Sequence, residues 1–433
     1  MPAHDIQDLL QFIDASPSPW HAVQTIVRRL QTAGFSALPE QDSWQLQPGG
    51  RYYVIRDDSS IILFVVGQQP LQRSGFRIVG AHTDSPGLRI KPNPVQDSDG
   101  LLRLGVEVYG GPILATFADR DLSLAGRLCY RSKQGQIASR LLHVDRPLLR
   151  LPNLAIHMNR KVNEEGLKLD KQKELPLLFS TAAERQLPRH RFLALLEDST
   201  GIDAERILSW ELNVYDTQKG EIWGADREFI ADSQLDNLAS CHAGLTALLD
   251  RDSLAADSTL VCAFFDHEEI GSVSRIGADG SFLPDILERI AVARGVGRCD
   301  LHRAMAQSFL ISADMAHAYQ PNFPAAYDPE HQVGVNQGPV IKINANQRYS
   351  TESLAAAQFI DCCEQAGVPF QKYSHRSDIP CGSTIGPMTA ARLGMRSIDV
   401  GNPLWAMHSV RESAGVLDHD YLIRALKKFF SGG

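Results

Sequence analysis

Several features that are scarce in this 433-residue chain narrow the class of protein it belongs to. Basic residues are not in excess, since 43 Lys and Arg stand against 51 Asp and Glu, a formal net charge of −8. No apolar run reaches the roughly 18 residues of a membrane-spanning helix. The seven cysteines are odd in number and form no Cys-x-x-Cys pair. These absences argue against nucleic-acid binding, a membrane span, a disulfide framework and a zinc ribbon.

The N-terminal segment and the cysteines both bear on the compartment. Residues 1–20 carry acidic residues where a signal peptide carries basic ones, and they lack an apolar core. Cysteines without a pairing pattern are typical of reduced, buried thiols. We therefore expect a cytoplasmic protein. Its apolar content of 43% is that of a globular chain, and its length favours two domains over a single core.

Helices and strands are predicted to alternate in the first and last parts of the chain. Strands are expected near 76–81, 259–265, 309–313 and 396–400, and helices near 235–249, 283–294, 352–366 and 420–430. The middle of the chain is mainly short strands and loops, and 159–190 is polar with little periodicity. The pattern predicts an α/β domain of residues 1–90 and 232–433, with helices on both faces of its sheet, interrupted by a β-rich insertion of residues 91–231.

Polar side chains follow several of the predicted strands. In open α/β sheets, ligands bind beyond the carboxyl ends of the strands, so these side chains are expected to meet at one edge. All of them are carboxylates or imidazoles, and none is a thiolate. They are His82 and Asp84 after strand 76–81, Glu268 and Glu269 after strand 259–265, Asp314 after strand 309–313, Asp236 at the start of a helix, and His408 in the loop after strand 396–400.

Each of these signals is weak when taken alone. A single His after a strand is commonly a hydrogen-bonded loop residue, and a single Asp before a helix is commonly an N-cap. The Glu268-Glu269 pair is more informative, because it follows the apolar run 261–265, where unpaired charge is costly. Adjacent carboxylates without a basic neighbour repel each other unless a cation lies between them, and a metal ion supplies that charge.

Seven motifs, in order along nearly the whole chain, resemble those of co-catalytic zinc aminopeptidases, and most closely the M18 aspartyl aminopeptidase family. The resemblance implies a zinc exopeptidase-like fold with a central mixed sheet. The motifs are Gly-Ala-His-Thr-Asp-Ser-Pro (80–86), Gln-Leu-Asp-Asn (234–237), Asp-His-Glu-Glu-Ile-Gly-Ser (266–272), Ser-Ala-Asp-Met-Ala-His (312–317), Ile-Lys-Ile-Asn-Ala-Asn-Gln-Arg-Tyr (341–349), Cys-Gly-Ser-Thr-Ile-Gly-Pro (381–387) and Met-His-Ser-Val-Arg-Glu (407–412).

The resemblance assigns a role to each residue of the cluster. It implies two zinc ions per subunit, for which Co or Mn are possible substitutes. Asp236 would bridge the two ions, with His82 and Asp314 on one and Glu269 and His408 on the other. Glu268 would be the general base that deprotonates the attacking water. Asp84 would be the carboxylate that orients a ligand imidazole.

Substrate binding is predicted on the same grounds. Lys342 alternates with apolar neighbours in 340–346, a pattern that by itself is also typical of a solvated strand face. The resemblance implies that Lys342 faces an N-terminal Asp or Glu side chain, with Tyr349 nearby. His157 is either a structural His of the insertion or, as the resemblance implies, a group that reaches the neighbouring subunit's active site. The insertion would then mediate dimerisation, and the dimers would form a homododecamer that admits peptides.

Two other functions remain as alternatives. A carboxypeptidase or an N-acyl amino-acid deacylase uses similar metal ligands but usually holds a free carboxylate with an Arg, whereas the M18-like strings here include Lys342. A non-enzymatic relative of the fold would have lost Glu268 or a ligand, and all are present. The sequence therefore predicts a dinuclear zinc aminopeptidase that releases N-terminal Asp or Glu from peptides.

Overall fold

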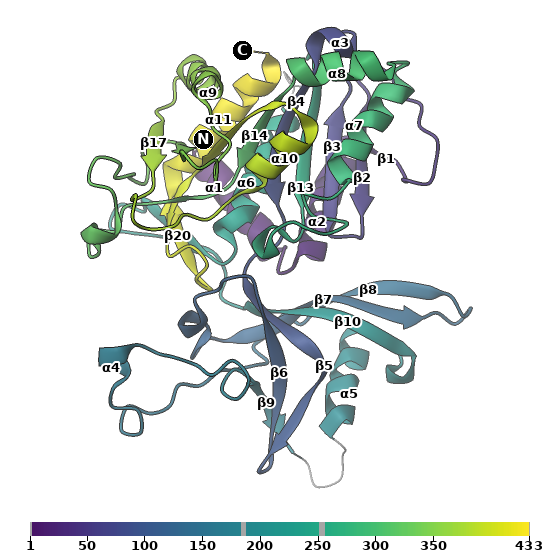
Figure 1. The fold of residues 1–433 in the computed structure, drawn as a ribbon. Helices are drawn as coiled ribbons and strands as arrows, with labels where there is room; N and C mark the ends of the chain where they lie inside the picture. Colours follow the sequence, from purple (N-terminus) through teal and green to yellow (C-terminus); the bar gives the residue numbers. More distant parts are fainter. Residues whose placement is uncertain (1, 183–187, 251–255, 433) are drawn as a thin grey trace.

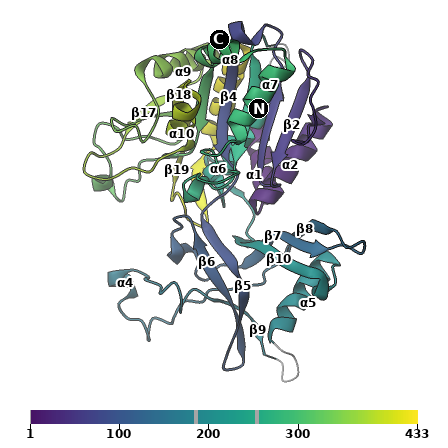
Figure 2. The ribbon, with the colours of Figure 1, turned by 45° about the vertical axis from the view of Figure 1, so that its right-hand side comes forward.

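The structure is a computed structural model that describes residues 2–182, 188–250 and 256–432. Residues 183–187, part of the polar stretch 159–190, lie outside the described residues. Two parts lie side by side in Figure 1 and Figure 2: a large layered part with both termini, and a smaller β-rich part. The loop that carries α4 (Val162–Glu165) extends sideways from the smaller part, to the left in both views.

A nine-stranded mixed sheet forms the middle layer of the large part. Its central strands β13, β4, β14 and β18 run parallel, whereas β3 is antiparallel to β13 and β16 is antiparallel to β18. In spatial order the strands are β1 (Ser36–Ala37), β2 (Arg51–Arg56), β3 (Ser60–Val65), β13 (Thr259–Phe265), β4 (Phe76–His82), β14 (Phe309–Ala313), β18 (Arg396–Gly401), β16 (Val340–Ile343) and β17 (Gln371–Ser374).

Helices cover both faces of this sheet, because its central strands are apolar on both sides. Every residue of β13 and of β14 is buried. One face packs against α1 (Pro2–Asp14), α2 (Pro19–Thr32), α6 (Leu235–Leu248), α9 (Ser353–Ala366) and α11 (Val416–Ser431). The other face packs against α3 (Leu71–Ser74), α7 (Phe282–Ala293), α8 (Arg298–Gln307) and α10 (Ile385–Leu393).

The smaller part is a six-stranded sheet in which every neighbouring pair is antiparallel. One helix, α5 (Pro188–Thr200), packs on it through Phe192 and Leu196, which join a hydrophobic core of its own. In spatial order the strands are β8 (Ile137–His143), β7 (Leu122–Arg131), β10 (Ile207–Asp216), β5 (Gly87–Ser98), β6 (Leu101–Tyr109) and β9 (Leu177–Thr181).

A third, five-stranded sheet joins the end of the insertion to the C-terminal part of the chain. β12 pairs with β20 in antiparallel fashion, so the segment that returns from the smaller part is held by the chain just after His408. In spatial order the strands are β11 (Glu221–Trp223), β12 (Phe229–Asp232), β20 (Glu412–Gly415), β19 (Pro403–Trp405) and β15 (Ala316–His317).

The α/β class with a mixed central sheet and helices on both faces is confirmed. The sequence pattern did not predict β5, α8 or β9, nor the five-stranded sheet. α11 also starts at Val416, earlier than the predicted residue 420. Among the described residues, no helix has both the length and the apolar character needed to cross a membrane.

Candidate metal centre

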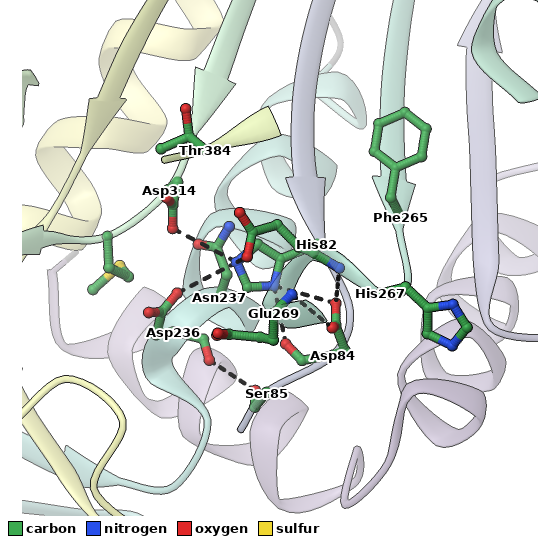
Figure 3. A network of polar contacts seen from close by, with 12 residues as sticks. His82, Asp84, Ser85, Asp236, Asn237, Phe265, His267, Glu269, Asp314 and Thr384 are labelled. Carbon is green, nitrogen blue, oxygen red and sulfur yellow. Dashed lines mark hydrogen bonds and ion pairs between the residues drawn. The ribbon is translucent and has the colours of Figure 1, made fainter. Parts of the chain in front are cut away.

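The parallel strands bring the predicted ligands to one edge of the nine-stranded sheet. His82 ends β4 and pairs in register with Phe265, the last residue of β13. Asp314 directly follows β14, which lies on the other side of β4. Asp236 lies at the N-terminal end of α6, which packs against β4. Figure 3 shows these side chains together with Asp84 and Glu269 at the carboxyl ends of the strands.

The first group of possible ligands surrounds the His82 imidazole. Its Nε2 lies 3.5 Å from Oδ1 of Asp236 and 3.6 Å from Oδ1 of Asp314. The ligand atoms of His82, Asp236 and Asp314 all lie within 4.8 Å of one another. Nδ1 of His82 is 3.0 Å from the backbone oxygen of Asp84, so it donates there and leaves Nε2 to face the carboxylates.

The second group surrounds His408. Its Nε2 lies 3.6 Å from Oδ2 of Asp236 and 3.4 Å from Oε2 of Glu269. The ligand atoms of Asp236, Glu269 and His408 again lie within 4.8 Å of one another. Asp236 therefore belongs to both groups, and each of its two oxygens faces a different imidazole.

The chemistry of this donor set fits a metal. Oδ1 of Asp236 is buried and makes no hydrogen bond within the described residues. Burial raises the pKa of Glu268 to about 8, and it raises the pKa of Glu269 as well, because each carboxylate is shielded from water beside other carboxylates. A divalent cation beside these carboxylates would favour their ionised forms and lower their pKa values. Two imidazoles and several carboxylates, with no thiolate, are N/O ligands suited to Zn, Co or Mn.

The Asp84 carboxylate contacts backbone more than imidazole. Its Oδ1 accepts from the backbone N–H of Glu268, and its Oδ2 accepts from that of Glu269, both at 3.1 Å. Oδ1 is also 3.5 Å from Nδ1 of His82. Burial opposes ionisation, but the His82 imidazole and the hydroxyl of Tyr109 hold the pKa of Asp84 below its usual value. Asp84 thus fixes the loop that carries both glutamates.

Glu412 is a site residue that sequence reasoning left without a role. It is 2% exposed, and its carboxylate accepts the backbone N–H of Asp236 at 2.9 Å and that of His408 at 2.7 Å. Glu412 therefore connects the backbone of Asp236 to the backbone of His408, two residues whose side chains face each other in the cluster. The only sequence signal was its place at the end of the motif 407–412.

The cluster opens into a cavity of about 280 Å³. Lys342 lines it and is 2% exposed, with Nζ 3.2 Å from Oδ2 of Asp314 and 3.1 Å from the backbone oxygen of Met315. The ring centroid of Tyr349 lies 5.1 Å from that Nζ. His317, to which sequence reasoning gave no role, lines the same cavity.

Glu268 lines this cavity too, with Oε2 3.9 Å from Nε2 of His82. Its neighbour His267 does not, since its ring points away from the cluster and Nδ1 lies 3.0 Å from Oγ of Ser274. His157 is not brought to the cluster either. It lies in an exposed loop of the smaller part, between β8 and α4, and is absent from the cavity lining.

This fold and cluster define a class of metal-dependent exopeptidases, and comparison with known proteins identifies the family. Residues 12–430 match the family pattern described as Aminopeptidase I zinc metalloprotease (M18). The chain belongs to the M18 family of zinc metallo-aminopeptidases, which are hydrolases that release N-terminal residues. The family resemblance expected from the sequence motifs is thereby confirmed, as is the expectation of an enzyme.

Similar proteins cover nearly the whole chain. A probable M18 family aminopeptidase 2 of Stutzerimonas stutzeri is 47% identical over 98% of this chain and 97% of that protein. One from Pseudomonas aeruginosa PAO1 is 46% identical over the same shares. Among solved structures, the Ape4 and Nbr1 complex contains a chain with 39% identity and a TM-score of 0.96, covering 99% of this chain and 86% of that one. The S. cerevisiae mApe1 dodecamer gives 27% identity and a TM-score of 0.86, covering 98% and 96%.

The position of Glu412 gives a first prediction. We expect Glu412→Gln to lower metal affinity about 10- to 100-fold, because an amide offers only one acceptor oxygen to two backbone donors. The measurement is competition of the purified protein with a chelator of known zinc affinity.

Asp418 provides a matched control. Asp418, on α11, is also a buried carboxylate and accepts the backbone N–H groups of Asn336 and Gly338, and it does not line the cavity of the cluster. Asp418→Asn should reduce thermal stability comparably while metal affinity stays at the wild-type value. Equal metal affinity in the two variants would show that Glu412 only supports the fold.

Proposed function

We propose that the protein is a dinuclear zinc aminopeptidase that removes N-terminal Asp or Glu from peptides. The observation that carries the proposal is the position of Asp236, whose two oxygens face His82 on one side and His408 on the other. A carboxylate shared in this way suits a pair of cations. His82, Asp236 and Asp314 would hold one ion, and Asp236, Glu269 and His408 would hold the second.

Glu268 and Asp84 are assigned the proton-transfer and positioning steps of the reaction. Bound zinc would supply Lewis acidity and a water acidified to near neutral pKa. Glu268 is assigned as general base because its carboxylate lies beside the ligand set, in the cavity that would hold the substrate. It would take the proton from the attacking water and deliver it to the leaving amine. Asp84 would keep Glu268 in place through the backbone N–H.

Lys342 is the group that favours acidic substrates. An ammonium has three N–H donors, and Lys342 directs two of them to Asp314 and to the Met315 carbonyl. The third is available to a carboxylate in the cavity. Because Lys342 is almost fully buried, its charge is poorly screened and would discriminate strongly between acidic and neutral N-terminal residues.

We further propose that residues 91–231 form a dimerisation domain and that the dimers build a homododecamer. A related protein has been solved as a dodecamer. The loop around His157 supports such contacts, because Leu154, Ile156 and Met158 are 56%, 47% and 75% exposed. Apolar side chains gathered in this way are typical of interaction surfaces. Within such a dimer, His157 would enter the active site of the partner subunit.

Metal removal tests the centre directly. We expect exhaustive chelation to abolish hydrolysis of Asp-anilide and to lower the thermal midpoint, because a ligand that binds only the folded state stabilises it. Adding back about two zinc ions per chain should restore both properties. Undiminished hydrolysis by the chelated protein would contradict the proposal, and preference for N-acetyl-Asp would favour the deacylase alternative.

The two adjacent glutamates should behave differently. Glu268→Gln is expected to keep two metal ions per chain while kcat falls by about 10²- to 10⁴-fold, because only the base is lost. Glu269→Gln, its matched neighbour, should lose metal because a ligand oxygen becomes an amide. Metal content by elemental analysis and steady-state kinetics distinguish the two, and the opposite pattern would exchange their roles.

Substrate preference tests Lys342. We expect Lys342→Ala to reduce kcat/KM on Asp- and Glu-anilides at least about 30-fold more than on Leu- or Ala-anilides, the equivalent of about 2 kcal/mol. Lys342 also contacts Asp314, so its loss could weaken metal binding and lower activity on every substrate. The ratio of kcat/KM on acidic substrates to kcat/KM on neutral substrates cancels that general effect. An equal loss on all four substrates would reject the specificity role.

Complementation tests the role of His157. Co-expression of His157→Ala and Glu268→Gln chains should restore activity to about one quarter of wild type, because half of randomly formed dimers are mixed and each has one intact site. Glu268→Gln with Asp236→Asn is the control, since both defects lie in the same site and no mixed dimer is active. Recovery that does not exceed this control would show that each subunit is self-sufficient.

A further inference from the structure

A turn of the smaller part reaches the metal centre from the opposite side to the nine-stranded sheet. It spans residues 110–113, between Tyr109, the last residue of β6, and the short 3₁₀ helix η1 (Leu114–Phe117). We propose that this turn is a positioning element of the active site, and that Tyr109 is a positioning residue for the Glu268 and Glu269 loop. The inference rests on the function proposed above, and it assigns the insertion a role within its own chain.

Tyr109 acts through Asp84. Its hydroxyl donates to Oδ2 of Asp84 at 2.7 Å, and the same carboxylate accepts the backbone N–H groups of Glu268 and Glu269. The Tyr109 side chain is 7% exposed, so this hydrogen bond is shielded from water. Without it, one oxygen of a fully buried carboxylate would lose a donor, and the carboxylate would be free to rotate away from the loop it holds.

The Tyr109 ring is held in place by a contact with Arg89. The guanidinium carbon of Arg89 lies 3.8 Å from its ring centroid, close enough for a cation–π contact. Arg89 belongs to β5, the strand beside β6 in the six-stranded sheet. The hydroxyl position is therefore set by two neighbouring strands of the smaller part rather than by a mobile loop.

The next residues of the turn contact the other half of the centre. Nδ1 of His408 donates to the backbone oxygen of Gly111 at 3.0 Å, which leaves Nε2 to face Asp236 and Glu269. The N–H of Ile113 donates to the His408 backbone oxygen at 2.9 Å. The turn thus fixes both the tautomer and the backbone of one proposed metal ligand.

Gly110 allows this close approach. Its φ is +65°, in the left-handed region that favours glycine, and a Cβ there would lie 3.1 Å from Cβ of Glu269. Tyr109, Gly110 and Gly111 therefore touch three separate supports of the centre in consecutive positions. A displacement of the six-stranded sheet would be transmitted to the general base and to His408 together.

The test compares two tyrosines of the same sheet. Tyr215, on β10, is 8% exposed, and its hydroxyl donates to the backbone oxygen of Val144 at 2.9 Å and lies 2.8 Å from Nε2 of His143. Its hydroxyl lies outside the Asp84 network, so Tyr215→Phe removes the same atom from a buried site without removing a hydrogen bond of the centre. Both variants are made in the full chain, and loss of the buried hydroxyl should reduce the thermal stability of each, that of Tyr215→Phe at least as much because its hydroxyl has two partners.

The expected results separate positioning from stability. Tyr109→Phe should lower kcat on Asp-anilide about tenfold with unchanged KM, and it should lower Co(II) affinity and alter the visible spectrum of the Co(II)-loaded protein. Tyr215→Phe should retain the wild-type values of kcat, Co(II) affinity and spectrum.

Identical kcat, Co(II) affinity and spectrum in the two variants would overturn the role of Tyr109 while leaving the proposed function intact. A wild-type protein that bound no Co(II) and showed no metal-dependent hydrolysis would instead contradict the metal centre itself. The two failures are therefore distinguishable.

Discussion

The structure depends on keeping several carboxylates apart from water and close to one another at one sheet edge. Asp84, Asp236, Glu269 and Glu412 are all buried or nearly so. Buried carboxylates are stable only when hydrogen-bond donors or cations compensate their charge. Backbone N–H groups donate to Asp84 and Glu412, and imidazoles face Asp236. A bound cation would compensate the remaining carboxylates. The M18 family's use of zinc follows naturally from that requirement.

The parts of the fold that sequence predicted well are those in which local pattern and tertiary role agree. The predicted bounds of β13 and β14 match the structure, because each is a short, mainly apolar run with an acidic residue directly after it. Three of the five proposed ligands, His82, Glu269 and Asp314, could be found for the same reason, because they end or follow such strands and the carboxyl ends of parallel strands meet at one edge. Asp236 opens a helix and His408 lies in a loop, so their assignment depended on the family resemblance.

Other parts of the fold and of the candidate site could not be predicted from the local sequence, because they depend on contacts between distant residues. β5 includes Lys, Pro, Asn, Gln and Asp, so it lacks the alternation of a strand, and its pairing with β6 depends on residues across the hairpin. Nothing in the sequence distinguishes Glu412 from any other acidic residue of a charged motif. Its role depends on two backbone N–H groups that lie 176 and 4 residues away. Tyr109 closed an ordinary strand, and its contact with Asp84 depends on how two sheets are placed.

The smaller part is inserted between two residues of the buried carboxylate cluster rather than appended at an end. The chain enters it at Gly87, three residues after Asp84, and leaves it through β12, which ends at Asp232, four residues before Asp236. Both junctions are therefore confined by the geometry of the centre, whereas the far loops are not. A change of length at the distal end of this module would therefore leave the centre in place, whereas a change at either junction would displace it.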